Sequence, residues 1–232
     1  MGSLKARTVF AWLVAFDLVL AVAYVLTNHL FVDAPEVIQH WFDLDAEQNL
    51  PTWYSSAQLL VLGLLSALYA CRVSDRFLRR FYLLAALAFV FFSADETATF
   101  HEGLTALSKN TSVRSFFPEA HGMWIIVYSL GFLALALIFR REIAAFLRER
   151  SGLATFLAGA ALFVTGGVLM EIVGYFVSAV QGTGSFPYAV EVTVEESLEL
   201  LGESLMTYVL LSRVLAAGPG LCQTAAGSRV VR

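Results

Sequence analysis

The chain has 232 residues, of which 58% are hydrophobic and 15% are charged, and its mean hydropathy is +0.71. A globular domain has about 45–50% apolar and about 25% charged residues, so long apolar runs in this composition are typical of an integral membrane protein. The net charge of −4 is accompanied by no clustered basic face, which excludes a nucleic-acid-binding protein.

Six apolar segments are each long enough, at ~1.5 Å per helical residue, to cross a hydrocarbon core of ~30 Å. They are Thr8–Thr27, Pro51–Cys71, Phe81–Glu102, His121–Phe139, Leu153–Val180 and Tyr188–Leu211. The predicted fold is an all-α polytopic bundle of six transmembrane helices, with residues 1–213 as one domain and 214–232 as a disordered cytoplasmic tail. Lys5 and Arg7 before the first run are also typical of a signal peptide, but the run is long for one, which favours an uncleaved helix.

The basic residues predict the orientation of the bundle. With the N-terminus in the cytoplasm, thirteen Lys and Arg residues fall on the cytoplasmic side and two, Lys109 and Arg114, on the outer side. This positive-inside bias predicts an inner-membrane protein with both termini in the cytoplasm. Cys71 and Cys222 then lie on the cytoplasmic side, where we expect reduced thiols and no disulfide.

The third segment ends in ionisable residues that hydrocarbon disfavours. Its sequence over residues 91–104 is FFSADETATFHEGL. On one continuous helix Asp95, Thr99 and Glu102 share a face, Glu96 borders that face, and His101 points away from Asp95. We therefore expect Asp95 and Glu102 to line a site, with His101 offset from it.

The sixth segment carries five glutamates, which fall within an arc of about 140° on a helix. They are Glu191, Glu195, Glu196, Glu199 and Glu203. Counted from the basic flanks, Glu199 reaches the level of Asp95, and Glu203 reaches the level of Asp17 near the midplane. Together with Glu171, which shares a stripe with glycines on the fifth segment, they predict a funnel that is open to the outer face.

No Lys or Arg lies inside the outer half of any predicted helix to pair with these carboxylates. Clustered carboxylates and imidazoles without cationic partners predict a divalent metal, with zinc, iron or manganese as the candidates. The expected metal ligands are Asp95, Glu102, His121, Glu196, Glu199 and Glu203, with His101 and Asp17 as secondary candidates. Glu96 or Glu171 is the expected catalytic general base.

Purely structural roles are also open for some of these residues. Glu191 and Glu195 can form a solvated first helical turn after Pro187, where acidic side chains suit the helix dipole. Asp17 can make a hydrogen bond between helices instead of relaying protons. Residues 43–49, DLDAEQN, alternate like the start of a calcium loop but lack its later glycine and glutamate, so they are interpreted as an acidic outer loop.

The function expected first is that of a metal-dependent membrane hydrolase or oxidoreductase acting on a lipid or other apolar substrate. A proton or divalent-cation transporter or channel, using Glu203 and Asp17 beyond the midplane, is the alternative. The cytoplasmic halves of the helices carry few polar residues, which favours a one-sided site. A third hypothesis is a non-catalytic accessory subunit whose acids pair with a membrane-protein partner, and a homo-oligomer is also open.

Overall fold

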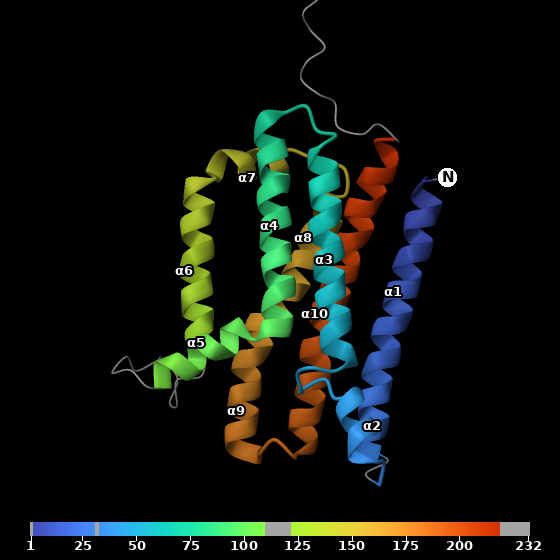
Figure 1. The fold of residues 1–232 in the computed structure, drawn as a ribbon, viewed down its shortest axis with the longest axis vertical. Coiled ribbons are helices and arrows are strands. Elements are labelled where there is room, and N and C mark those ends of the chain that lie inside the picture. The colour runs from blue at the N-terminus through green and yellow to red at the C-terminus, as the bar shows by residue number, and fades with distance from the viewer. Residues whose placement is uncertain (1, 31–32, 110–121, 219–232) are drawn as a thin grey trace, which may run out of the picture.

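A computed structural model describes residues 2–30, 33–109 and 122–218, and all the regular structure in these ranges is helical. The elements pack as a bundle of long antiparallel helices (Figure 1). In chain order they are α1 (Gly2–Tyr24) with a π-helical continuation η1 (Val25–Leu30), α2 (Glu36–Trp41), α3 (Leu50–Ala70), α4 (Arg76–Ala98), α5 (Phe100–Lys109), α6 (Met123–Ile138), α7 (Arg140–Leu147), α8 (Leu153–Val164), the π-helix η2 (Thr165–Met170), α9 (Glu171–Gln181) and α10 (Phe186–Ala216).

Several of these helices are long and apolar enough to cross a membrane. Within the described residues four stretches qualify, namely Leu4–Leu30, Leu50–Ala70, Arg76–Ala98 and Leu153–Gln181. A fifth is added if α6 and α7, which meet at an angle of 81°, count as one. α10 is 31 residues long but does not qualify, since it carries five glutamates. The prediction of an all-α bundle is confirmed, and four to five helices are long and apolar enough to span a membrane. The sixth crossing and the orientation stay predictions.

α10 is the central helix of the bundle. It packs against α1, α3, α8, η2 and α9. A buried core joins it to its neighbours through Leu62 of α3, Tyr82 of α4, Phe146 of α7, and Met206 and Leu210 of α10. α4 in turn packs against α3, so the side chains of α10 point into interior space that α1, α3, α8 and α9 surround. The helix also ends on the side of the bundle where α1 begins (Figure 1).

α10 meets α8 at a close contact between the two backbones. A Cβ atom added at Gly202 would lie 2.6 Å from the Gly159 carbonyl oxygen and 2.7 Å from the Phe163 nitrogen. Both neighbours are backbone atoms, so neither can move aside without moving its helix. Glycine is therefore required here for the two backbones to approach each other.

A buried ion pair fastens the last turns of α10 to the segment between α7 and α8. Arg213 Nη1 lies 2.7 Å from Glu149 Oε2, and Arg213 is only 7% exposed. The Tyr69 hydroxyl donates to Glu149 Oε1 at 3.0 Å, and the Tyr82 hydroxyl donates to Oε2. These donors satisfy the carboxylate in a position where an unpaired charge is strongly disfavoured.

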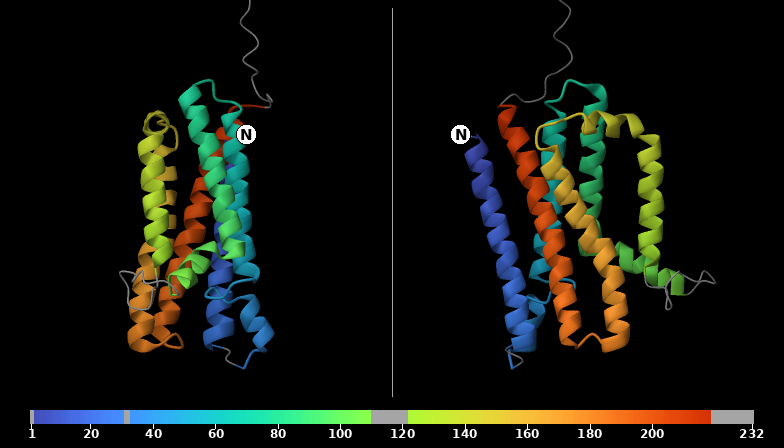
Figure 2. Two further views of the ribbon diagram at one scale, coloured as in Figure 1. Left: turned by 60° about the vertical axis from the view of Figure 1, so that its left-hand side comes forward. Right: turned by 180° about the vertical axis from the view of Figure 1, so that it is seen from behind.

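α6 stands away from α4 along most of its length (Figure 2). Its closest neighbours are α5 at one end and α7 at the other. α7 turns sharply from α6 and packs across α4, with the Phe146 ring stacked on Phe81 at a centroid distance of 4.2 Å. The arrangement holds α6 as a separate wall on this side of the bundle.

The prediction that the third segment is one helix through Glu102 is wrong. α4 ends at Ala98, Thr99 has a left-handed backbone with φ 52°, and α5 runs off to the side (Figure 1). The Asp95 carboxylate accepts a hydrogen bond from the His101 backbone N–H at 3.0 Å. The backbone N–H groups in the first turn of a helix have no partner within that helix, and the His101 N–H belongs to the first turn of α5. Asp95 therefore caps α5 and stabilises the break.

The last segment also extends further than predicted. α10 continues to Ala216, beyond the expected start of a disordered tail at residue 214. The rest of the predicted tail, from residue 219 onward, lies outside the described residues.

Candidate functional site

An acidic cavity of about 630 Å³ lies between α4, α5, α6, η2, α9, α10 and the loop before α3. Ten carboxylate side chains and the imidazole of His101 line it. The carboxylates are those of Asp45, Glu47, Asp95, Glu96, Glu102, Glu171, Glu191, Glu195, Glu196 and Glu199. Neither Lys nor Arg occurs among the described lining residues. A cavity with this lining attracts cations.

Most of the residues singled out in the sequence meet at this cavity. Seven of them line it, namely Asp95, Glu96, His101, Glu102, Glu171, Glu196 and Glu199. Glu203 and Asp17 are buried elsewhere between helices. The predicted ligand His121 lies outside the described residues.

Three side chains at one corner of the cavity have the spacing of a metal-binding group. One ligand atom from each of Glu47, His101 and Glu102 lies within 4.8 Å of the other two. Glu47 was not among the expected ligands, because sequence reasoning assigned it to an acidic outer loop. The alternating acids of residues 43–49 were the signal that could have identified it.

The expectation that His101 points away from Asp95 is wrong. His101 Nδ1 lies 3.4 Å from Asp95 Oδ1, and the His101 backbone N–H binds the same oxygen. The expectation assumed an unbroken helix, and the left-handed Thr99 removes that assumption. For the same reason Asp95 and Glu102 lie on different helices and reach the cavity from different directions.

Electrostatics at this corner favour an added positive charge. Burial by itself would lower the pKa of His101, but its hydrogen bond to Asp95 and the negative charges around it outweigh burial and raise that pKa. Burial, together with the negative charge of Glu102, raises the pKa of Glu47. The negative charge that raises the pKa of His101 would also act on a metal cation placed at this point, whereas burial, the largest cause of the raised pKa of Glu47, supplies no such attraction.

Glycines on the opposite helix make room for the glutamates of α10. A Cβ atom at Gly166 would lie 2.5 Å from Glu199 Cγ, and one at Gly167 would lie 3.0 Å from Glu199 Oε1. Further along, a Cβ atom at Gly174 would lie 2.7 Å from Glu191 Oε2. Gly166 and Gly167 belong to the π-helical turn η2, a distortion that is frequent at functional sites.

Glu191 does not form the solvated helical turn that was one of its two open interpretations. It is 5% exposed, and it lies within α10, which already begins at Phe186. Its carboxylate packs against the backbone of α9 at Gly174 instead of reaching solvent. The expected stripe of Gly167, Glu171 and Gly174 does face α10 and the cavity.

Asp17 and Glu203 make hydrogen bonds in the interior between α1, α3 and α10, and Ser55, the partner of Glu203, also bonds the cavity residue Glu96. The Tyr54 hydroxyl and the Ser204 hydroxyl each donate to Asp17 at 2.9 Å. Ser55 Oγ donates to Glu203 Oε1 at 3.1 Å, and Glu203 is fully buried. Asp17 therefore makes hydrogen bonds between helices, which is the structural role that the sequence left open for it beside proton relay.

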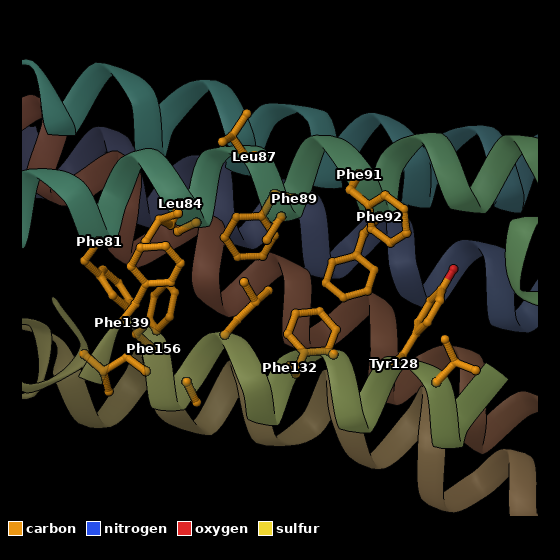
Figure 3. A pocket seen from close by; sticks show the side chains of 17 residues that line it. Phe81, Leu84, Leu87, Phe89, Phe91, Phe92, Tyr128, Phe132, Phe139 and Phe156 are labelled. Atoms are coloured by element: carbon orange, nitrogen blue, oxygen red, sulfur yellow. The ribbon is translucent and has the colours of Figure 1, made fainter. Parts of the chain in front are cut away.

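An apolar cleft of about 860 Å³ separates α4 from α6 (Figure 3). Seventeen residues line it, and Tyr128 carries the one polar side chain among them. Phe92, Tyr128 and Phe132 also line the acidic cavity. The apolar cleft and the acidic cavity are therefore adjacent and share a wall.

Comparison with known proteins gives a family assignment. Neither the curated proteins nor the solved structures contain a match to this chain. One protein-family model matches residues 12–214, which is most of the sequence and includes α3 to α9 entirely. By this match the chain belongs to the family described as "Domain of unknown function (DUF8692)".

Proposed function

We propose that this chain is a multi-pass inner-membrane protein that binds a divalent metal at an outer-facing carboxylate and histidine site and acts on a lipid or other apolar substrate. The observation that carries the proposal is the convergence of Glu47, His101 and Glu102 within 4.8 Å, inside a cavity whose described lining has ten carboxylates and no basic residue. Two carboxylates and one imidazole are a ligand set suited to zinc, iron or manganese.

The proposed topology has six crossings with both termini in the cytoplasm. α10 is the proposed sixth crossing, with its glutamates turned to the cavity and to the packed helices of the interior. Charged residues within membranes normally face the bundle interior or water. α1 begins and α10 ends on one side of the bundle (Figure 1), in agreement with an even number of crossings. The positive-inside bias of the sequence makes that side cytoplasmic.

In the proposed site Asp95 supports the histidine ligand. Asp95 engages His101 Nδ1 at 3.4 Å, so Nε2 is the ring nitrogen left to face a cation. A carboxylate behind a ligating histidine fixes the orientation of the ring and increases its basicity. Two further predicted ligands, Glu196 and Glu199, line the same cavity and add carboxylates for a cation.

A metal ion at this position would polarise a substrate oxygen or lower the pKa of bound water. Glu96 and Glu171 are the proposed general bases, since each contributes a carboxylate to the same cavity. The adjoining apolar cleft supports an apolar substrate, because Phe92, Tyr128 and Phe132 border both spaces.

Metal analysis of the purified protein tests this proposal. We expect near-stoichiometric zinc, iron or manganese in the wild type, and strongly reduced occupancy in Glu47→Gln and Glu102→Gln. Asp95→Asn should weaken metal affinity about 10–100-fold, as loss of a supporting carboxylate does. Glu36→Gln, an exposed acid of α2 away from the cavity, is the matched control. Metal content that is unchanged in both ligand variants contradicts the proposal.

Proton or divalent-cation transport is the second candidate, favoured by one observation. Glu203 is fully buried next to the polar network of Ser55 and Ser204, deeper in the bundle than the cavity. Beyond this level α3 and α10 meet mainly through the apolar side chains of Leu62, Met206 and Leu210, with Ser66 and Thr207 as buried polar side chains, so few polar groups line a route. Flux into liposomes that is abolished by Glu203→Gln would favour transport over one-sided chemistry.

A further inference from the structure

The cleft between α4 and α6 has the dimensions of a site for one hydrocarbon chain. Phe81 and Phe92, which mark its two ends on α4, are eleven residues apart, or about 17 Å along the helix. This is close to half of a ~30 Å hydrocarbon core. The volume of about 860 Å³ lies within the range of about 300–1,000 Å³ for small-molecule sites.

The two ends of the cleft differ in chemistry. At one end α7 crosses α4, and Phe81 stacks on Phe146. At the other end the Tyr128 hydroxyl marks the transition to the acidic cavity (Figure 3). Phe92 and Phe132, which line both spaces, stack at a centroid distance of 5.5 Å, so the head group of an occupant has to pass beside this ring pair to reach the cavity. An occupant of the cleft therefore has an apolar end near α7 and a polar end among the carboxylates.

The charge of the cavity selects the head group of that occupant. Ten carboxylates and one imidazole line the cavity, and its described lining lacks Lys and Arg. An ammonium group entering from the cleft is attracted by this field and can donate hydrogen bonds to several carboxylates. A phosphate or carboxylate head group is repelled, because like charges placed together are strongly disfavoured.

We propose that the cleft binds a long-chain amine, with its single hydrocarbon chain between α4 and α6 and its amino head group in the acidic cavity. Binding follows from the shape of the cleft and the charge of the cavity. The further step, that this amphiphile is the substrate class, rests on the proposed metal-dependent function.

Filling the cleft from α6 tests the proposal directly. A Cβ atom added at Gly131 meets nothing within 4 Å, so Gly131→Trp can project into the cleft without a backbone clash. Gly131→Leu occupies less of the cleft and should have a smaller effect. Leu133→Trp is the matched control, because Leu133 is 56% exposed on the same helix and does not line the cleft.

The probes are hexadecylamine and palmitic acid, each carrying a photoreactive diazirine in its chain, added to the full chain in phosphatidylcholine nanodiscs. We expect the amine to label peptides of α4 and α6 about tenfold or more strongly than the acid. Labelling should be lost in Gly131→Trp, reduced in Gly131→Leu and retained in Leu133→Trp. Equal labelling by amine and acid, labelling away from α4 and α6, or a second copy of the chain crosslinked in the cleft would each overturn the proposal.

The same samples separate this inference from the proposed function. Labelling is measured with metal bound and after chelation, beside the metal content of each sample. Amine labelling in a protein that binds no metal leaves the cleft proposal intact and removes the metal proposal. A protein that binds metal but is not labelled by the amine in the cleft removes the cleft proposal and leaves the metal proposal intact.

Discussion

Gly202 provides a sharp test of how closely α8 and α10 are packed. In Gly202→Ala the new methyl carbon would lie 2.6 Å from the Gly159 carbonyl oxygen, whereas ordinary contact begins at 3.4 Å. The two helices must therefore separate by about 0.8 Å, since the obstructing atoms belong to the backbone. Overpacking of this kind costs about 1–3 kcal/mol. Replacing glycine by alanine in a helix returns about 0.5–1 kcal/mol. The difference between the two ranges has a midpoint of about 1 kcal/mol, which is the net loss expected in the free energy of unfolding.

Thermal unfolding in detergent micelles, followed by circular dichroism at 222 nm, measures this loss. For a chain of this length 1 kcal/mol corresponds to about 2–4 °C, so Gly202→Ala should lower Tm by about 2–4 °C. Gly131→Ala is the matched control, because its Cβ atom meets nothing within 4 Å. The control gains helix propensity without a clash and should keep or raise Tm. A Gly202→Ala protein as stable as the wild type would refute the close backbone contact.

Three further substitutions probe the packing around α10 in the same assay. Tyr54→Phe removes a hydrogen bond to the buried Asp17 carboxylate and should cost about 1–3 kcal/mol; no loss of stability would mean that this hydroxyl does not stabilise Asp17. Glu149→Ala leaves Arg213 buried without its carboxylate, and we expect a loss of about 3–5 kcal/mol, which a small change in Tm would contradict. Arg80→Ala breaks a long pair of 3.8 Å between an Arg80 side chain that is 65% exposed and a Glu142 side chain that is 7% exposed. Because the guanidinium is largely solvated, its loss should cost less than about 1 kcal/mol, and a larger cost would show that the buried Glu142 depends on Arg80.

Hydrophobic runs were sufficient to predict the long helices. The predicted run Pro51–Cys71 corresponds to α3 at Leu50–Ala70. The helix begins there because the Asn49 side chain caps it by accepting a hydrogen bond from the Thr52 backbone N–H. The glycine stripe on the fifth segment also predicted a helix face packed against protein, since only small residues permit such an approach. Both inferences use information that lies within one segment of the chain.

The break at Thr99 could not be predicted in this way. A non-glycine residue with positive φ is uncommon, and the residues around Thr99 carry no local signal for it, whereas a glycine there would have indicated a helix end. The conformation is stabilised by Asp95, which caps the first turn of α5. Glu47 was missed for a related reason, because its meeting with His101 depends on how the loop before α3 folds against α5.

The acidic cavity is difficult to explain as a requirement of folding alone. A charged side chain inside a membrane helix costs about 2.5–3.5 kcal/mol on insertion scales, and glycine in a helix costs about 0.5–1 kcal/mol relative to alanine. Gly166, Gly167 and Gly174 nevertheless lie directly against the side chains of Glu199 and Glu191. Gly166 is also required by the α10 backbone, since a Cβ atom there would lie 2.8 Å from the Glu195 carbonyl oxygen, but at Gly167 and Gly174 the nearest atoms belong to the glutamate side chains. Leucine on α10 facing alanine at these two positions would fill the space with more favourable burial and helix propensity. The fold instead retains two unfavourable features at one place, and each becomes understandable if the carboxylates have a cation to bind.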